Sequence, residues 1–185
     1  MSRVLVRRLL TPHPDTPAGE FSVTAKVSHS GPGFLEFEFV VNGPVGELAL
    51  PAMGAGERTD GLWKTTCFEA FLMAPGGGAY LELNMSPSRR WAAYDFDAYR
   101  HGMADAADVS IEIRRGTPDR TCLEVTGLAS SQRFAELDVT SLGLSAILEH
   151  GDGSKSFWAL AHPEGQPDFH HAACFAATIP ATGEA

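Results

Sequence analysis

Two neighbouring segments of the chain carry polar side chains inside otherwise apolar runs. Glu69 lies in CFEAFL, and Glu82 and Asn84 lie in YLELNM. Successive side chains on a strand point to opposite sides, so Glu82 and Asn84 share one face. The short turn APGGG predicts that the two runs form a hairpin, which brings Glu69 onto the same face. Such a cluster can bind a polyhydroxylated ligand, because each hydroxyl both donates and accepts hydrogen bonds.

Two other interpretations of these residues stay open at this stage. Cross-strand neighbours can place Glu69 and Glu82 roughly 5 Å apart, the separation of a retaining glycoside hydrolase pair. The pattern is too generic to favour an enzyme, and we expect no catalytic activity. Alternatively, the polar face is simply exposed to water, as one face of an antiparallel sheet commonly is.

The elements that must position these residues are short strands. Runs with alternating or β-branched and aromatic character recur along the chain: VLVRRLL, FSVTAKV, FLEFEFVV, CFEAFLM, YLELNM, WAAYDF, VSIEIR, CLEVTGL, LSAILE, FWALA and ACFAATI. Segments rich in Gly, Pro, Ser, Asn and Asp separate them and supply turns. Only residues 130–138, SSQRFAELD, predict a turn or two of helix after a capping serine. The sequence therefore predicts an all-β, two-sheet antiparallel sandwich with very little helix, spanning residues 1–185 as one domain.

Composition and charge narrow the partners. The chain has 185 residues and a formal net charge of −9, which opposes binding to nucleic acid or to an anionic membrane surface. No apolar run approaches the roughly 18 residues that span a bilayer. The N-terminal MSRVLVRRLL lacks the uninterrupted apolar core of a secretory signal. Three widely spaced cysteines indicate neither a disulfide framework nor a zinc site, so we expect a cytoplasmic protein.

The C-terminal stretch SFWALAHPEGQPDFHHAACF adds a strand with Trp158 and His162 on one side, followed by a Pro-rich loop. That loop contains Asp168, His170 and His171. Their spacing matches no established metal motif, so no metal site is predicted. We expect Asp168 and His170 to hold this loop in place.

Three segments together resemble a known group: DGLWKTTCFEAFL, YLELNMSPSRRWAAYDFDAYRHGM and FWALAHPEGQPDFHHAACF. Their order is similar to that in bacterial DOMON-like proteins related to family 9 carbohydrate-binding modules, over roughly residues 20–178. The resemblance implies an immunoglobulin-like β-sandwich that binds a ligand rather than catalysing a reaction. It also implies that Trp63 stacks on a sugar, with Trp158 as a second platform. Modules of this type are usually secreted appendages of hydrolases, whereas for this chain we expect neither a signal nor an attached hydrolase domain.

The sequence thus predicts a non-catalytic module for a carbohydrate or similar small polar ligand. The predicted ligand-binding residues are Trp63, Glu69, Tyr80, Glu82, Asn84, Arg89, Trp91, Trp158, His162 and His170. No cofactor is predicted, although haem and calcium stay open as alternatives. Haem would need axial ligands from Met53, Met73, Met85, Met103, His162 or His170. A protein-interaction sandwich with an exposed tryptophan patch and no small ligand is the other alternative.

Overall fold

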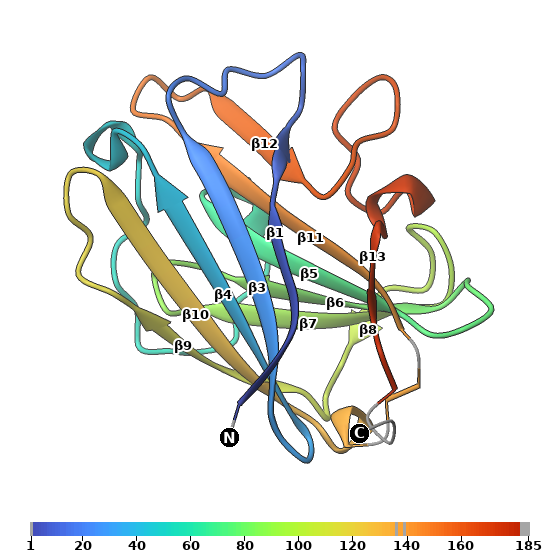
Figure 1. The fold of residues 1–185 in the computed structure, drawn as a ribbon. Coiled ribbons are helices and arrows are strands. Elements are labelled where there is room, and N and C mark those ends of the chain that lie inside the picture. Colours follow the sequence, from blue (N-terminus) through green and yellow to red (C-terminus); the bar gives the residue numbers. More distant parts are fainter. Residues whose placement is uncertain (1, 136, 139, 182–185) are drawn as a thin grey trace.

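The computed structural model describes residues 2–135, 137–138 and 140–181. It contains two antiparallel sheets that pack face to face, with the five-stranded sheet in front of the eight-stranded sheet in Figure 1. The predicted all-β sandwich is therefore confirmed. Within the described residues, no helix is long and apolar enough to cross a membrane.

The five-stranded sheet has the order β1-β3-β4-β10-β9. Its strands are β1 (Arg3–Leu9), β3 (Ser22–Gly31), β4 (Phe34–Asn42), β10 (Cys122–Ser130) and β9 (Ser110–Arg115). The sequence of β4 is typical of a strand with one buried face, because buried and more exposed residues alternate along FLEFEFVVN. One face of this sheet therefore packs on the core and the other meets solvent.

The eight-stranded sheet has the order β2-β12-β11-β5-β6-β7-β8, with β13 added to β11. Its strands are β2 (Thr11–Pro12), β12 (Lys155–Ala159), β11 (Thr140–Glu149), β5 (Cys67–Met73), β6 (Tyr80–Met85), β7 (Trp91–Phe96), β8 (Ala104–Asp105) and β13 (Ala177–Ile179). The predicted hairpin between the two glutamate-bearing runs is confirmed as β5 and β6. All eleven predicted runs overlap strands, whereas β2 and β8, of two residues each, were not predicted.

Short 3₁₀ turns connect some of the strands. They are η1 (Val45–Glu47), η2 (Leu62–Lys64), η3 (Gln132–Phe134) and η4 (Ala172–Cys174). The helical turn predicted within residues 130–138 is η3, and the Ser131 side chain caps it by accepting a hydrogen bond from the Arg133 N–H. Residue 136 of that segment lies outside the described residues.

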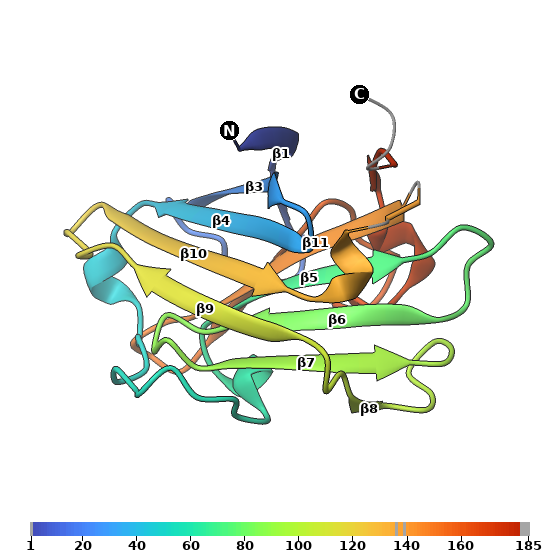
Figure 2. The ribbon, with the colours of Figure 1, turned by 90° about the horizontal axis from the view of Figure 1, so that it is seen from below.

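The main core lies between the sheets. Phe39 of β4 stacks on Phe68 of β5 with ring centroids 5.0 Å apart, which joins the two layers directly. Figure 2 shows β9 beside β7, where the sheets are in contact along one edge. The sandwich therefore brings the inward-facing residues of both sheets into one apolar cluster.

A second apolar cluster lies on the outer face of the eight-stranded sheet. It includes Phe71, Tyr94, Phe96 and Ile147 from the strands and Phe169 from the closing loop, the name used here for residues 160–171. This loop follows β12 and leads into η4, beside β13 in Figure 1. Loops therefore cover a face that in many antiparallel sheets is exposed to water.

Gly143 of β11 lets the chain around η4 approach this outer face. A Cβ atom at this position would lie 3.3 Å from the Cys174 carbonyl oxygen and 3.3 Å from the Phe71 Cβ. These contacts are tight, so glycine is the residue that allows the turn to pack directly on the sheet.

Candidate functional site

A cavity of about 660 Å³ opens on the outer face of the eight-stranded sheet, between that sheet and its covering loops. Its lining residues are Trp63, Lys64, Glu69, Glu82, Phe96, Arg100, Met103, Ile147, Lys155, Phe157, Pro167, Phe169 and His170. The strands provide the floor, while η2, the 97–103 loop and the closing loop provide the walls. Aromatic rings and a few polar groups therefore meet in one hollow, which is the usual composition of a small-molecule site.

Strand register places the two glutamates on the floor. Glu69 lies opposite Asn84, and Glu82 lies opposite Phe71, so the carboxyl groups are diagonal neighbours on one face. Both side chains are nearly inaccessible, with Glu69 3% and Glu82 5% exposed. The loops above the sheet account for this burial, and the alternative of a polar face exposed to water is wrong.

Each carboxyl group accepts a hydrogen bond from a neutral side chain. The Ser145 hydroxyl donates to Glu69 Oε2 at 3.2 Å, and Asn84 Nδ2 donates to Glu82 Oε1 at 2.6 Å. The amide oxygen of Asn84 accepts from the Cys67 thiol, whose Sγ is 3.6 Å away. Asn84 therefore has a fixed orientation, with its NH₂ group toward Glu82.

Burial changes the ionisation of this cluster. Loss of hydration, followed by repulsion from Glu82, raises the pKa of Glu69 to about 8. Loss of hydration also raises the pKa of Glu82, against the Asn84 hydrogen bond that lowers it. Because two close carboxylates in a low-dielectric site repel each other, the pair retains a proton at a pH where exposed glutamates are fully ionised.

His170 projects from the closing loop over the same cluster. Tyr80 Oη lies 2.8 Å from His170 Nδ1 and also accepts the Arg100 backbone N–H, so its own proton is free to go to the imidazole. Burial lowers the pKa of His170 to about 4, which keeps the ring neutral at pH 7. Nδ1 then accepts, and Nε2 carries the hydrogen, 3.8 Å from Glu82 Oε2. This contact is therefore not an ion pair at neutral pH.

Asp168 fixes the closing loop to the 97–103 loop. Its carboxylate accepts hydrogen bonds from Arg100 at 2.7 Å and from the Tyr99 hydroxyl at 2.5 Å, and also accepts the His170 backbone N–H at 3.2 Å. Burial would raise the pKa of Asp168, but the bonds from Tyr99 and Arg100 outweigh it and lower that pKa. Asp168 and His170 therefore make the contacts expected of residues that hold this loop.

Trp63 forms part of the cavity's rim. Its indole is 38% exposed and contacts the Tyr94 ring edge-on at 6.1 Å, and the Tyr94 hydroxyl donates to Asp60 at 2.6 Å. Beside it, Lys155 Nζ donates to the Lys64 carbonyl oxygen at 2.6 Å, which ties β12 to η2. An aromatic surface therefore stands at the entrance and is available to a ligand.

The structure brings together six of the ten predicted ligand-binding residues. Trp63, Glu69, Glu82 and His170 line the cavity, and Tyr80 and Asn84 contact them by hydrogen bonds. The remaining four lie elsewhere: Arg89, Trp91, Trp158 and His162. None of these four is among the residues that line the cavity.

The predicted roles of the other tryptophans are corrected by their burial. Trp158 is 2% exposed and packs between the sheets, so it cannot serve as a platform for a sugar. Trp91 pairs with Met85 and is half-buried against the same core. The alternative of an exposed patch formed by Trp63, Trp91 and Trp158 is therefore wrong, since Trp63 alone of the three is exposed.

Arg89 and His162 also lie away from Glu69 and Glu82. Arg89 is an exposed turn residue with φ 75°, between β6 and β7. His162 lies at the start of the closing loop, where its Nε2 is 2.8 Å from the Thr11 carbonyl oxygen. It contacts the ring of His13 instead of the glutamates.

Several residues that line the cavity were not predicted from the sequence. Phe157 is the neighbour of Trp158 on β12, and alternation places it on the cavity side because Trp158 faces the core. Phe169 and Arg100 come from loops, where no periodic signal exists. Alternation along β7 could have identified Phe96, because Tyr94 lies opposite Glu82 and Phe96 shares the face of Tyr94.

The alternative ligands are tested by the positions of their candidate donors. Of the six residues considered for haem, Met103 and His170 line the cavity. Met85 lies in the core between the sheets. Among the described residues, no group of three or more His, Cys, Asp or Glu side chains is arranged to hold a metal ion.

Comparisons with known proteins bear on the fold. No family model matches the sequence, and a search of curated proteins finds no match. A candidate carbohydrate-binding protein from Bacteroides uniformis is similar in structure, with a TM-score of 0.62 and 16% identity over 94% of this chain and 83% of that one. A family 9 carbohydrate-binding module from Caldicellulosiruptor kristjanssonii, in complex with cellotriose, has a TM-score of 0.54 and 8% identity over 88% and 74% of the two chains. The shared property is the β-sandwich fold, and the DOMON-like resemblance stays a prediction.

Proposed function

We propose that this chain is a non-catalytic carbohydrate-binding module whose ligand enters the cavity on the outer face of the eight-stranded sheet. The observation that carries the proposal is the pairing of buried hydrogen-bonding groups with aromatic walls in one cavity of about 660 Å³. The similarity in fold to carbohydrate-binding proteins supports it.

The chemistry of the cavity fits a sugar. Glu69 and Glu82 on the floor can accept hydrogen bonds from hydroxyl groups, and a protonated carboxyl can also donate one. The Nε2–H of His170 adds a donor beside them. Phe96, Phe157 and Phe169 provide apolar surface for the C–H faces of a pyranose ring. A site of this kind binds without needing a nucleophile or a metal ion.

Thermal-shift screening of the purified chain against mono- and oligosaccharides, nucleotide-sugars, haem and calcium tests the proposal. A ligand that binds the folded chain selectively raises the melting temperature by mass action. We expect a sugar to do so, and we expect Glu82→Ala and Trp63→Ala to abolish or weaken the shift. Matched controls are Glu124→Ala on β10 and Trp91→Ala, which lie away from the cavity.

Three results would contradict the proposal in different ways. No rise in melting temperature with any sugar would contradict the proposal and favour a protein partner. A haem Soret band on reconstitution would indicate the haem alternative. Turnover of chromogenic glycosides that is lost in Glu82→Gln would indicate an enzyme.

A further inference from the structure

In the described part of the chain, the two glutamates of the cavity floor have no lysine or arginine within ion-pair distance, and the charge of Arg100 reaches them only from farther away. Within the described residues, no Lys or Arg nitrogen forms an ion pair with either carboxyl group. Their partners are the neutral Ser145 hydroxyl, the neutral Asn84 amide and His170, which burial keeps uncharged. Buried acidic groups are normally paired with a cation, and this pair is an exception that calls for an explanation.

The missing partner can come from the cavity. Glu69 Oε2 accepts from Ser145, whereas no side chain or backbone group of residues 2–135, 137–138 and 140–181 donates to Oε1. The enclosed unpartnered side-chain atoms of the described residues are histidine nitrogens, and Glu69 Oε1 is not one of them. Since Glu69 is 3% exposed and lines the cavity, its free oxygen is accessible from that side.

The cations of the cavity lie at its rim and have other partners. Arg100 lowers the pKa of both glutamates through its charge, but its guanidinium is hydrogen-bonded to Asp168. The Lys155 ammonium donates to the Lys64 carbonyl oxygen. Lys64 is exposed to solvent, so water and salt screen its charge. The buried carboxyl groups therefore dominate the electrostatic character of the floor, where the dielectric constant is lower.

We propose that the preferred ligand is an amino sugar whose protonated amine lies against Glu69 and Glu82. This inference rests on the proposed function and specifies its ligand class. The ammonium can donate up to three hydrogen bonds to carboxylate oxygens, and the neighbouring rings of Phe96 and Phe157 attract a cation through their π faces. The cation also stabilises both ionised carboxylates, so ligand binding releases the proton that the pair retains.

Three trisaccharides that differ only at C2 test this ligand class. They are the β-1,4-linked trimer of glucosamine, its N-acetylated form and cellotriose, and glucuronic acid is added as an anionic probe. Calorimetric titrations at pH 5.5, where the amines of the free glucosamine trimer are already protonated, are run at 0.15 M salt in two buffers of different ionisation enthalpy. We expect the glucosamine trimer to bind at least about tenfold more tightly than cellotriose, because charge-assisted hydrogen bonds replace neutral ones. We also expect its apparent enthalpy to show proton release.

Variants distinguish binding of the amine in the cavity from general attraction of a cation to this acidic chain, which has a net charge of −9. Glu69→Gln and Glu82→Gln preserve side-chain shape and should reduce the preference for the amine to near parity. Glu124→Gln removes an exposed charge from β10 and should leave it unchanged. Circular dichroism and melting confirm that each variant is folded, and the wild-type comparison does not depend on them.

Each contrary result has a distinct meaning. Cellotriose or the N-acetylated trimer binding as tightly as the amine would overturn the inference and leave the proposed function intact. Tighter binding of glucuronic acid would assign specificity to Lys64 and Lys155 and would also overturn it. Equal loss in Glu124→Gln would show that the attraction is a surface effect. No binding by any of the sugars would contradict both the inference and the proposed function.

Discussion

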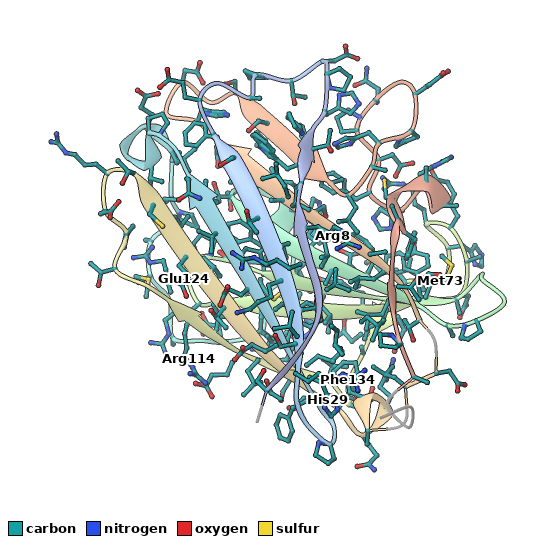
Figure 3. The ribbon with its side chains drawn as sticks, viewed as in Figure 1. Arg8, His29, Met73, Arg114, Glu124 and Phe134 are labelled. Atoms are coloured by element: carbon teal, nitrogen blue, oxygen red, sulfur yellow. The ribbon has the colours of Figure 1, made fainter. Side chains whose placement is uncertain are left out.

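Lys26 and Glu38 pair across the outer face of the five-stranded sheet, with their side chains 23% and 28% exposed. Glu69 and Glu82 lie on the outer face of the eight-stranded sheet and are 3% and 5% exposed. Figure 3 labels Arg8, Arg114 and Glu124, which belong to strands of the five-stranded sheet. Loops that cover one outer face and leave the other open therefore turn ordinary strand carboxylates into a site with altered ionisation.

The strands on the two sides differ in the same way. β4 alternates buried and more exposed residues, whereas β6 is buried at all six positions. A strand buried on both faces tolerates polar groups only where they have partners or where a cavity admits a ligand. The substitutions below test this difference between the two outer faces.

The largest expected effect is on stability, in Phe71→Ala. Phe71 is 1% exposed and contacts the rings of His170 and Phe175. Its truncation should lower the free energy of unfolding by about 3–5 kcal/mol. Phe34→Ala, at a 41% exposed position on β4, should cost about 0.5 kcal/mol or less. Urea denaturation measures both, and equal losses would show that the two outer faces do not differ.

The second expected effect is release of the closing loop in Asp168→Asn. The substitution removes the charge that binds Arg100 and Tyr99, at a cost of about 1–3 kcal/mol. Hydrogen exchange should accelerate in residues 160–171. Glu38→Gln, which breaks an ion pair of the other sheet, should cost less than about 1 kcal/mol. Unchanged exchange in Asp168→Asn would mean that apolar packing alone holds the loop.

The third expected effect is a change in the pH dependence of stability. The folded chain holds the Glu69 proton up to a pKa of about 8, while the ordinary value is 4.5. The unfolded chain therefore binds fewer protons between these values, so the contribution of Glu69 to stability falls as pH rises from 4.5 to 8. Glu69→Gln should flatten this decline and be relatively more stable at pH 8. Melting temperatures recorded from pH 5 to 9 measure this decline, with Glu38→Gln as the control. If Glu69→Gln leaves the slope of melting temperature against pH unchanged, burial of an ionisable Glu69 is contradicted.

Among the substitutions at the cavity and its covering loops, Trp63→Ala has the smallest expected effect on stability. Because Trp63 is at the rim and 38% exposed, the free energy of unfolding should fall by less than about 1 kcal/mol. Affinity for a sugar should nevertheless fall several-fold, since the indole is lost from the entrance. Trp158→Ala should show the opposite pattern, with a large loss of stability and little direct effect on sugar affinity, because this residue is 2% exposed in the core. A large stability loss in Trp63→Ala would indicate that this indole is part of the core.

The hairpin of β5 and β6 could be predicted because alternation and a short turn are local signals. Which side chains of β12 face the core could not be predicted, because Trp158 and Phe157 are adjacent and either could have faced it. The covering loops were beyond prediction, because the contact between Arg100 and Asp168 joins residues 68 positions apart without a periodic pattern. The sequence could therefore identify the polar cluster but could not show that it is enclosed.

The central claim is that a ligand binds under the loops of the eight-stranded sheet. Backbone amide chemical shifts of the isotopically labelled chain, recorded during titration with cellotriose and the glucosamine trimer, test it most directly. We expect the shifts to concentrate in residues 61–64, 67–73, 80–85, 97–103 and 160–171. Shifts confined to β3, β4, β9 and β10, or no shifts with either sugar, would contradict it.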